Sequence, residues 1–189
     1  MKMSLVTRFT YSIVVTLALA GVSPAPALAQ GAGERHGPEH KSALVNAVRE
    51  STARFHDVPA AEAEGYYLMF GCVSGPDGGA MGMHFVNLPL AGDSVLDPAR
   101  PEIVIYEPTA SGKLRLIGAD FLVFKEVWEG AHPGTTPQVM GQLMHLIEAP
   151  NRYGLPAFYT LHVWAWKESP TGTFVNWHSK VSCDAYNPQ

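Results

Sequence analysis

The chain has 189 residues, with 13 lysines and arginines against 17 aspartates and glutamates, and its formal net charge is −4 with neutral histidines. A mildly acidic chain without a cluster of basic residues is a poor partner for nucleic acid or anionic lipid, because both attract grouped lysines and arginines. We therefore expect no nucleic-acid partner. The length suits one domain with a substantial hydrophobic core.

Residues 1–29 are typical of a cleavable signal peptide. Lys2 and Arg8 supply a positive start, residues 11–21 are an uncharged apolar run, and the segment ends in the small-x-small pattern ALA. The apolar run is shorter than the roughly 20 residues that a membrane-spanning helix needs, and a retained anchor is the alternative. We expect an exported protein, periplasmic or extracellular, that starts near Gln30 and has no membrane partner after cleavage.

Helices are expected at the start of the mature chain. Residues 30–39 form a Gly-rich polar leader, and a single α+β domain is expected over 40–189. Residues 40–56 show the spacing of an amphipathic helix, with apolar side chains at Leu44, Val48 and Phe55. A short second helix is expected over 58–64.

From Tyr66 onward, short apolar runs alternate with turn signals, which is typical of β-structure. The expected strands are 66–73, 83–87, 102–107, 113–124 and 158–167, of which the third and fourth form a hairpin, and 174–183 is an extended tail. Residues 125–157 are expected to be largely irregular, with a helical turn around 138–147. The predicted fold class is α+β: an antiparallel sheet or small barrel with the N-terminal helices packed on it.

Cys72 and Cys183 are the two cysteines of the chain. In an oxidising compartment a lone pair of cysteines usually forms a disulfide, which would tie the end of the chain to the start of the sheet. A thiolate metal ligand or nucleophile is the alternative, although no CxxC spacing supports it. We predict the disulfide.

Alternation of side chains along a strand predicts which polar residues point inward. In the strand 113–124, Asp120 shares its face with small or apolar residues, namely Leu114, Leu116, Gly118, Leu122 and Phe124. Glu107 ends a similar face in 102–107, and His84 and His162 have apolar neighbours. A carboxylate on an apolar face is costly unless it is paired, hydrogen-bonded or metal-bound.

These side chains suggest a metal site. Two histidines with a carboxylate can bind Fe(II) or Mn(II), and three histidines can bind Zn or Cu. The candidate ligands are His84 and His162, with Glu107 or Asp120 as the carboxylate and His145 as a third imidazole. The expected cofactor is one divalent transition metal (Zn, Cu, Fe or Mn), or none.

A purely structural role for the same residues is the alternative. Strand histidines are often hydrogen-bonded core residues, and no short motif such as HxH or HExxH is present. Asp120 would then pair with Arg115, Arg152 or a buried tyrosine, and Glu107 would end its strand in solvent.

Aromatic residues cluster in the last strand and beyond it. Phe158, Trp164 and Trp166 either pack in the core or line an apolar ligand pocket beside His162, since pockets are commonly aromatic-lined with few polar groups. No GxSxG, P-loop or GxGxxG motif is present.

The segments DVPAAEAEGY, MGMHFVN, PEIVIYEP, GKLRLIGADF, LPAFYTLHVWAWKESPTGTF and VSC together resemble a family of exported bacterial proteins of unassigned function. His84, Glu107, His162 and Cys183 match the motifs of that family. Asp120 stands where the pattern usually has Glu, which keeps the carboxylate but shortens its reach. The resemblance implies no reaction.

Three functions remain open at this stage. The first is an exported protein that binds a metal ion or small molecule, and the second is a metal-dependent enzyme that activates water or dioxygen. The third is a structural or stress-related protein without a site.

Overall fold

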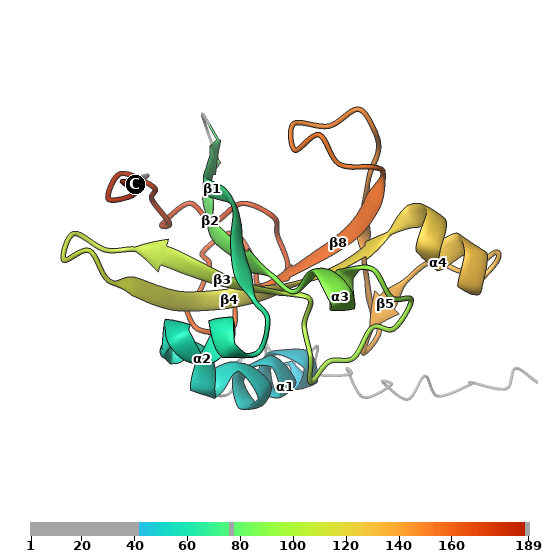
Figure 1. Ribbon diagram of the computed structural model, residues 1–189, viewed down its shortest axis with the longest axis horizontal. Helices are drawn as coiled ribbons and strands as arrows, with labels where there is room; N and C mark the ends of the chain where they lie inside the picture. Colours follow the sequence, from blue (N-terminus) through green and yellow to red (C-terminus); the bar gives the residue numbers. More distant parts are fainter. Residues whose placement is uncertain (1–41, 76–77, 188–189) are drawn as a thin grey trace, which may run out of the picture. The chain divides into compact units, whose positions relative to one another are not determined.

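A curled antiparallel sheet with helices against one face is formed by residues 42–75 and 78–187, which the computed structural model describes (Figure 1). The expected signal peptide and leader, residues 1–39, lie outside the described residues. The predicted α+β class is confirmed. In chain order the elements are α1 (Ala43–Thr52), the 3₁₀ helix η1 (Ala53–His56), α2 (Val58–Ala63), β1 (Tyr67–Gly75), β2 (Gly79–Val86), α3 (Leu88–Ala91), β3 (Ile103–Pro108), β4 (Leu114–Phe124), α4 (Lys125–Ala131), β5 (Gln138–Val139), β6 (Gln142–Leu143), β7 (His145–Ile147) and β8 (Phe158–Val163).

The first two helices form the layer beneath the sheet in Figure 1. Helix α1 begins after Ser42, whose side chain accepts a hydrogen bond from the backbone N–H of Val45 and so satisfies one free donor of the first turn. Its buried side, including Val45 and Val48, packs in one apolar cluster with Phe121 of β4. This layer covers one face of the sheet, which we call the helix face. The opposite face is called the pocket face.

Six strands pair in the order β1-β2-β3-β4-β8-β7, and each neighbouring pair is antiparallel. The expected hairpin of β3 and β4 is therefore present. Strand β8 is buried on both faces. It directs Tyr159, Leu161 and Val163 to the helix face. It directs Phe158, Thr160 and His162 to the pocket face.

The predicted alternation of side chains between the two faces of the sheet is wrong for the part of β4 before Gly118. The pairing of β3 with β4 shifts between Ile105, opposite Gly118, and Tyr106, opposite Leu116, so Ile117 is an extra residue. This bulge reverses the faces, and Leu116 packs on the helix face while Asp120 stays on the pocket face. A Cβ at Gly118 would lie 2.5 Å from the carbonyl oxygen of Val163, so glycine permits the close approach of β8.

Residues 125–157 contain more regular structure than the sequence indicates. They hold α4, the small β5–β6 pair, and β7, which adds an edge strand beside β8. The helical turn predicted around 138–147 is wrong, because these residues form strand segments instead. Each segment has only two or three residues, too short for the periodicity of a strand to show in the sequence.

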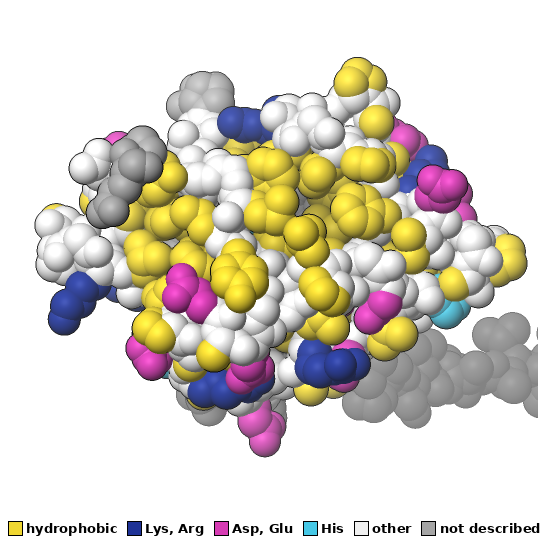
Figure 2. Space-filling view, in the orientation of Figure 1, with side chains coloured by type: hydrophobic (Ala, Val, Ile, Leu, Met, Phe, Trp, Pro, Cys, Tyr) yellow, Lys and Arg dark blue, Asp and Glu magenta, His cyan; other side chains and the backbone are white. Residues whose placement is uncertain are grey.

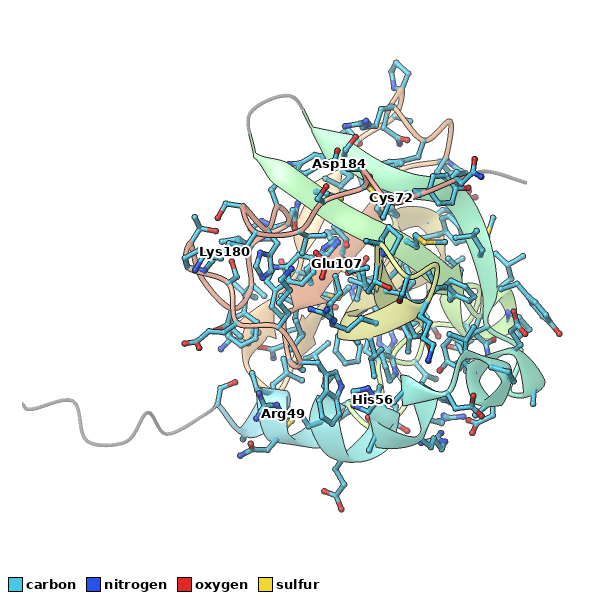
Figure 3. The ribbon with its side chains drawn as sticks, turned by 90° about the vertical axis from the view of Figure 1, so that its left-hand side faces the viewer. Arg49, His56, Cys72, Glu107, Lys180 and Asp184 are labelled. Carbon is cyan, nitrogen blue, oxygen red and sulfur yellow. A yellow bond between two sulfur atoms is a disulfide. The ribbon has the colours of Figure 1, made fainter. Side chains whose placement is uncertain are left out.

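The predicted disulfide between Cys72 and Cys183 is present. It joins β1 to the C-terminal segment across a sequence separation of 111 residues, and it lies beside Asp184 in Figure 3. Cys72 follows directly on an irregularity of β1, since Met69 pairs with His84 and Cys72 with Met83 while the two residues between them are left over. The bond therefore holds one end of a two-residue bulge.

Replacing both cysteines by serine, C72S with C183S, should lower the free energy of unfolding by about 4 kcal/mol, because a long cross-linked loop restricts the unfolded chain. Urea unfolding of the oxidised protein and of the double variant measures the difference. The wild type should show no thiol that reacts under denaturing, non-reducing conditions. Two reactive thiols would contradict the disulfide.

Glu102 is an acidic residue buried at the start of β3, with 1% of its surface exposed. Its Oε2 accepts a hydrogen bond from the backbone N–H of Leu122 at 3.0 Å. Burial raises the pKa of Glu102 to about 8, and the neighbouring charges of Asp120 and Asp93 act in the same direction. The folded protein therefore keeps this carboxyl protonated at neutral pH, whereas the unfolded chain ionises it.

Because the folded pKa lies above the unfolded one, Glu102 costs stability as pH rises toward about 8. Between pH 6.5 and 8 its contribution to the free energy of unfolding should fall with a slope of about 1.4 kcal/mol per pH unit at the lower end and about half of that at pH 8, where the folded carboxyl is half ionised. The Glu102→Gln variant keeps the shape of the side chain but does not titrate. Its free energy of unfolding should therefore fall less steeply between pH 6.5 and 8. Urea unfolding with EDTA present, repeated at several pH values, gives the free energy of unfolding of each protein. Equal slopes of this free energy against pH for the two proteins would contradict this assignment.

Candidate metal centre

Three of the predicted ligands, His84, Asp120 and His162, meet on the pocket face. One ligand atom from each lies within 4.8 Å of the others. Asp120 of β4 and His162 of β8 are direct neighbours in the pairing of the two strands, whereas His84 comes from β2, three strands away from β8. On a flat sheet that separation would be about 14 Å, so the curl of the sheet is what brings His84 to the group.

The two imidazoles face each other through the same ring atom. Nε2 of His84 lies 3.3 Å from Nε2 of His162, and the ring planes are inclined by 77°. Two nitrogens at the usual bond length from a tetrahedral metal ion are themselves roughly 3.3 Å apart. The pair therefore already has the spacing of two ligands on one ion.

Asp120 is held by its neighbours on β8. Its Oδ1 accepts hydrogen bonds from the hydroxyl of Thr160 at 2.7 Å and the backbone N–H of Leu161 at 3.0 Å. The same oxygen lies 3.5 Å from Nδ1 of His162. These contacts orient the carboxylate beside the histidine pair.

Burial determines the charge of the group. It lowers the pKa of both His84 and His162, so the two imidazoles are neutral near pH 7 and each has one nitrogen lone pair to offer. Burial also raises the pKa of Asp120, to about 6, which still leaves this carboxylate largely ionised at neutral pH. Neutral imidazoles with an ionised carboxylate are the protonation states that a metal ion requires.

Several buried polar atoms around the group form no hydrogen bond of good geometry among the residues described. They are Nδ1 of His84, Nδ1 of His162 and Oδ1 of Asn176. Buried polar side-chain atoms are normally satisfied in folded proteins, so such a group at one place calls for an explanation. An ion on the Nε2 atoms would make Nδ1 of each ring an N–H donor, for which the backbone of Gly82 and the side chain of Asn176 are the neighbouring acceptors.

The group forms part of the floor of a pocket between β1 and β8. The volume open to the centre of a water molecule is about 70 Å³. His84, Asp120, Thr160, His162 and Asn176 are the polar lining near the floor, and the remaining lining is nearly all apolar, including Met69, Phe70, Leu88, Ile147 and Leu155. Figure 2 shows hydrophobic side chains gathered on this face of the molecule.

The structure does not bring Glu107 to this group. Its carboxylate accepts a hydrogen bond from Nζ of Lys167 at 2.6 Å and lies 3.8 Å from the guanidinium of Arg115 (Figure 3). Glu107 shares the pocket face. Ile103 is the residue of β3 that lies opposite Asp120, and Glu107 is four residues further along the strand, roughly 13 Å from Ile103. It holds the C-terminal segment through Lys167, which also bonds to the carbonyl of Lys180.

His145 also remains outside the group. It pairs with Thr160 on the edge strand β7 and is exposed, although its charge helps to lower the pKa of His162. Asn176 was not among the predicted ligands, because it lies in a tail without regular structure. Thr160 could have been found, since it stands two residues from His162 and therefore on the same strand face.

The three aromatic candidates, Phe158, Trp164 and Trp166, lie in different parts of the structure. Phe158 lines the pocket. Trp164 is buried beside His162, with ring centroids 5.6 Å apart. Its indole N–H donates to the carbonyl of Val175, which fixes the ring that packs against the histidine. Trp166 is placed elsewhere, because it packs on the helix face and donates to the hydroxyl of Thr52.

Within the part of the chain that the structure describes, no helix has the length and apolar character needed to cross a membrane. Comparisons with family models, with curated proteins and with solved structures gave no match to this chain. The resemblance to a family of exported bacterial proteins therefore stays a prediction.

Proposed function

We propose that the protein binds one divalent transition metal ion through His84, His162 and Asp120. The observation that carries this proposal is the 3.3 Å approach of the two Nε2 atoms, with a carboxylate oxygen within 4.8 Å of both ligand nitrogens. Two imidazoles and one carboxylate suit Zn(II), Fe(II) or Mn(II), and they match the metals expected from the residue types.

A structural histidine pair explains less of the geometry. If one Nε2 simply donated to the other, a single hydrogen bond would join the pair. The pair would also carry the cost of placing two imidazoles and a carboxylate in an apolar pocket. A divalent cation offsets that cost because it binds all three groups. Burial already favours the neutral imidazoles that such an ion requires.

Metal-dependent catalysis is the second candidate function. The group found among the described residues has three ligands rather than four, and it lies on the floor of a pocket that reaches the surface. Catalytic metal sites typically have three protein ligands and one position for water or substrate. This arrangement supports turnover, but binding without turnover is the simpler function.

We also propose that the protein is exported. The residue pattern at 1–29 is that of a signal peptide, and the Cys72–Cys183 disulfide fits an oxidising compartment. The metal site would then act outside the cytoplasm.

The metal proposal predicts stoichiometric uptake of Zn²⁺ or Co²⁺ by the untagged mature protein. His84→Ala, His162→Ala and Asp120→Asn should each lower the affinity at least about a hundredfold, because each removes a ligand. Isothermal titration calorimetry with Zn²⁺ measures this, and circular dichroism checks that the variants fold. Bound metal should also raise the melting temperature of the wild type.

His145→Ala is the matched control for those variants, because His145 lies nearby but outside the group. It should keep the affinity of the wild type. An affinity loss equal to that of His84→Ala would contradict the ligand set. If elemental analysis finds no metal retained by wild type after dialysis against Zn²⁺, the site itself is refuted.

The export proposal predicts that the chain, expressed with its leader in a bacterial host, is recovered outside the cytoplasm with Gln30 as its first residue. Intact-mass measurement gives the cleavage point. Ala27→Asp with Ala29→Asp should block cleavage, because signal peptidase requires small residues there. Recovery of an uncleaved wild-type chain from the cytoplasm would contradict export.

A further inference from the structure

The lining of the pocket that reaches the surface is apolar. The polar side chains gather at the metal group, while the rim is built by apolar residues such as Met69, Phe70 and Leu88. Leu88 and Phe70 leave 56% and 48% of their surface exposed at that rim. A ligand that matches this distribution has one polar end and an apolar body.

The backbone at the rim supports a binding role. Phe70 has a φ of 64°, a left-handed conformation that costs energy for an aromatic residue and is uncommon outside glycine, asparagine and aspartate. It belongs to the bulge left between Met69 and Cys72, which the disulfide holds at one end. The bulge places the ring of Phe70 at the rim, where it is half exposed. Strained residues of this kind cluster at ligand sites.

The net charge of the metal group at the floor of the pocket determines which polar end the ligand should have. A divalent ion with Asp120 as a carboxylate and two neutral histidines has a net charge of +1, which one anionic group would neutralise. No lysine or arginine is among the pocket-lining residues that the structure describes, so the metal would be the cation that attracts an anion there. The side-chain amide of Asn176, buried in the lining, is a donor for a second oxygen of the same group.

We infer that the pocket binds a small monocarboxylate with an apolar body, its carboxylate on the metal and its body against Leu88 and Phe70. This inference rests on the proposed metal site. The volume of about 70 Å³ corresponds to roughly two water molecules at their liquid volume, and the open rim extends it. The carboxylate and the first carbons of such a ligand fill that volume, and the rest of a chain of roughly eight carbons would lie along the apolar rim.

The test uses octanoate with metal-loaded and metal-free wild type, after elemental analysis has established the metal content. Octanoate should bind the metal-loaded protein at least tenfold more tightly than the metal-free protein, as measured by calorimetry. Acetate, which lacks the apolar body, and octan-1-ol, which lacks the charge, should each bind at least tenfold more weakly than octanoate to the metal-loaded form.

Leu88→Ala and Phe70→Ala should weaken octanoate binding severalfold while leaving Zn²⁺ affinity unchanged, because they touch the body of the ligand and not the metal. Leu143→Ala is the matched control, since Leu143 is an equally exposed leucine outside the pocket lining. It should change neither affinity.

The outcomes separate the two proposals. If the protein retains metal but octanoate does not bind, the inference is overturned and the metal site stands. Equal octanoate affinity with and without metal also overturns it, because the carboxylate would then not lie on the ion. If no metal is retained, the proposed function fails first and this inference falls with it.

Discussion

The curl of the antiparallel sheet is the constraint on which the candidate site depends. His84 and His162 stand on strands separated by β3 and β4, yet their Nε2 atoms are 3.3 Å apart. Bulges in β1 and at the β3–β4 pairing increase local twist and bend, and Gly118 admits the backbone of β8 where any side chain would strike a carbonyl oxygen. Without that bend His84 would be separated from Asp120 and His162, which are neighbours on β4 and β8.

Bringing these groups together has an energetic cost that the fold meets in two ways. Hydrogen bonds from Thr160 and from the backbone of Leu161 partly compensate Asp120, and the histidines stay neutral because burial lowers their pKa. These contacts orient the group without satisfying it. The facing Nε2 atoms of the two histidines mark the position at which a cation would lower the free energy most.

Much of the fold and part of the site could be predicted from the sequence, and the reason is burial. His84, Asp120 and His162 each interrupt an apolar strand face, which is visible in the residue order alone. Alternation, however, describes a straight strand. It could not place the bulge at Ile117, and it could not show that Glu107 lies too far along β3 to join the group. Distance along and across a sheet depends on register, which the residue order of one chain does not contain.

The two faces of the sheet differ in a way that bears on function. The helix face is closed by α1 and α2 and contains an apolar core, so its residues are explained by packing. The pocket face is covered in part by the C-terminal segment, which Cys183 ties to β1 and Glu107 holds through Lys167. The pocket reaches the surface between Phe70 and Leu88. The exposure of these apolar side chains above a polar floor suits the binding site that we propose.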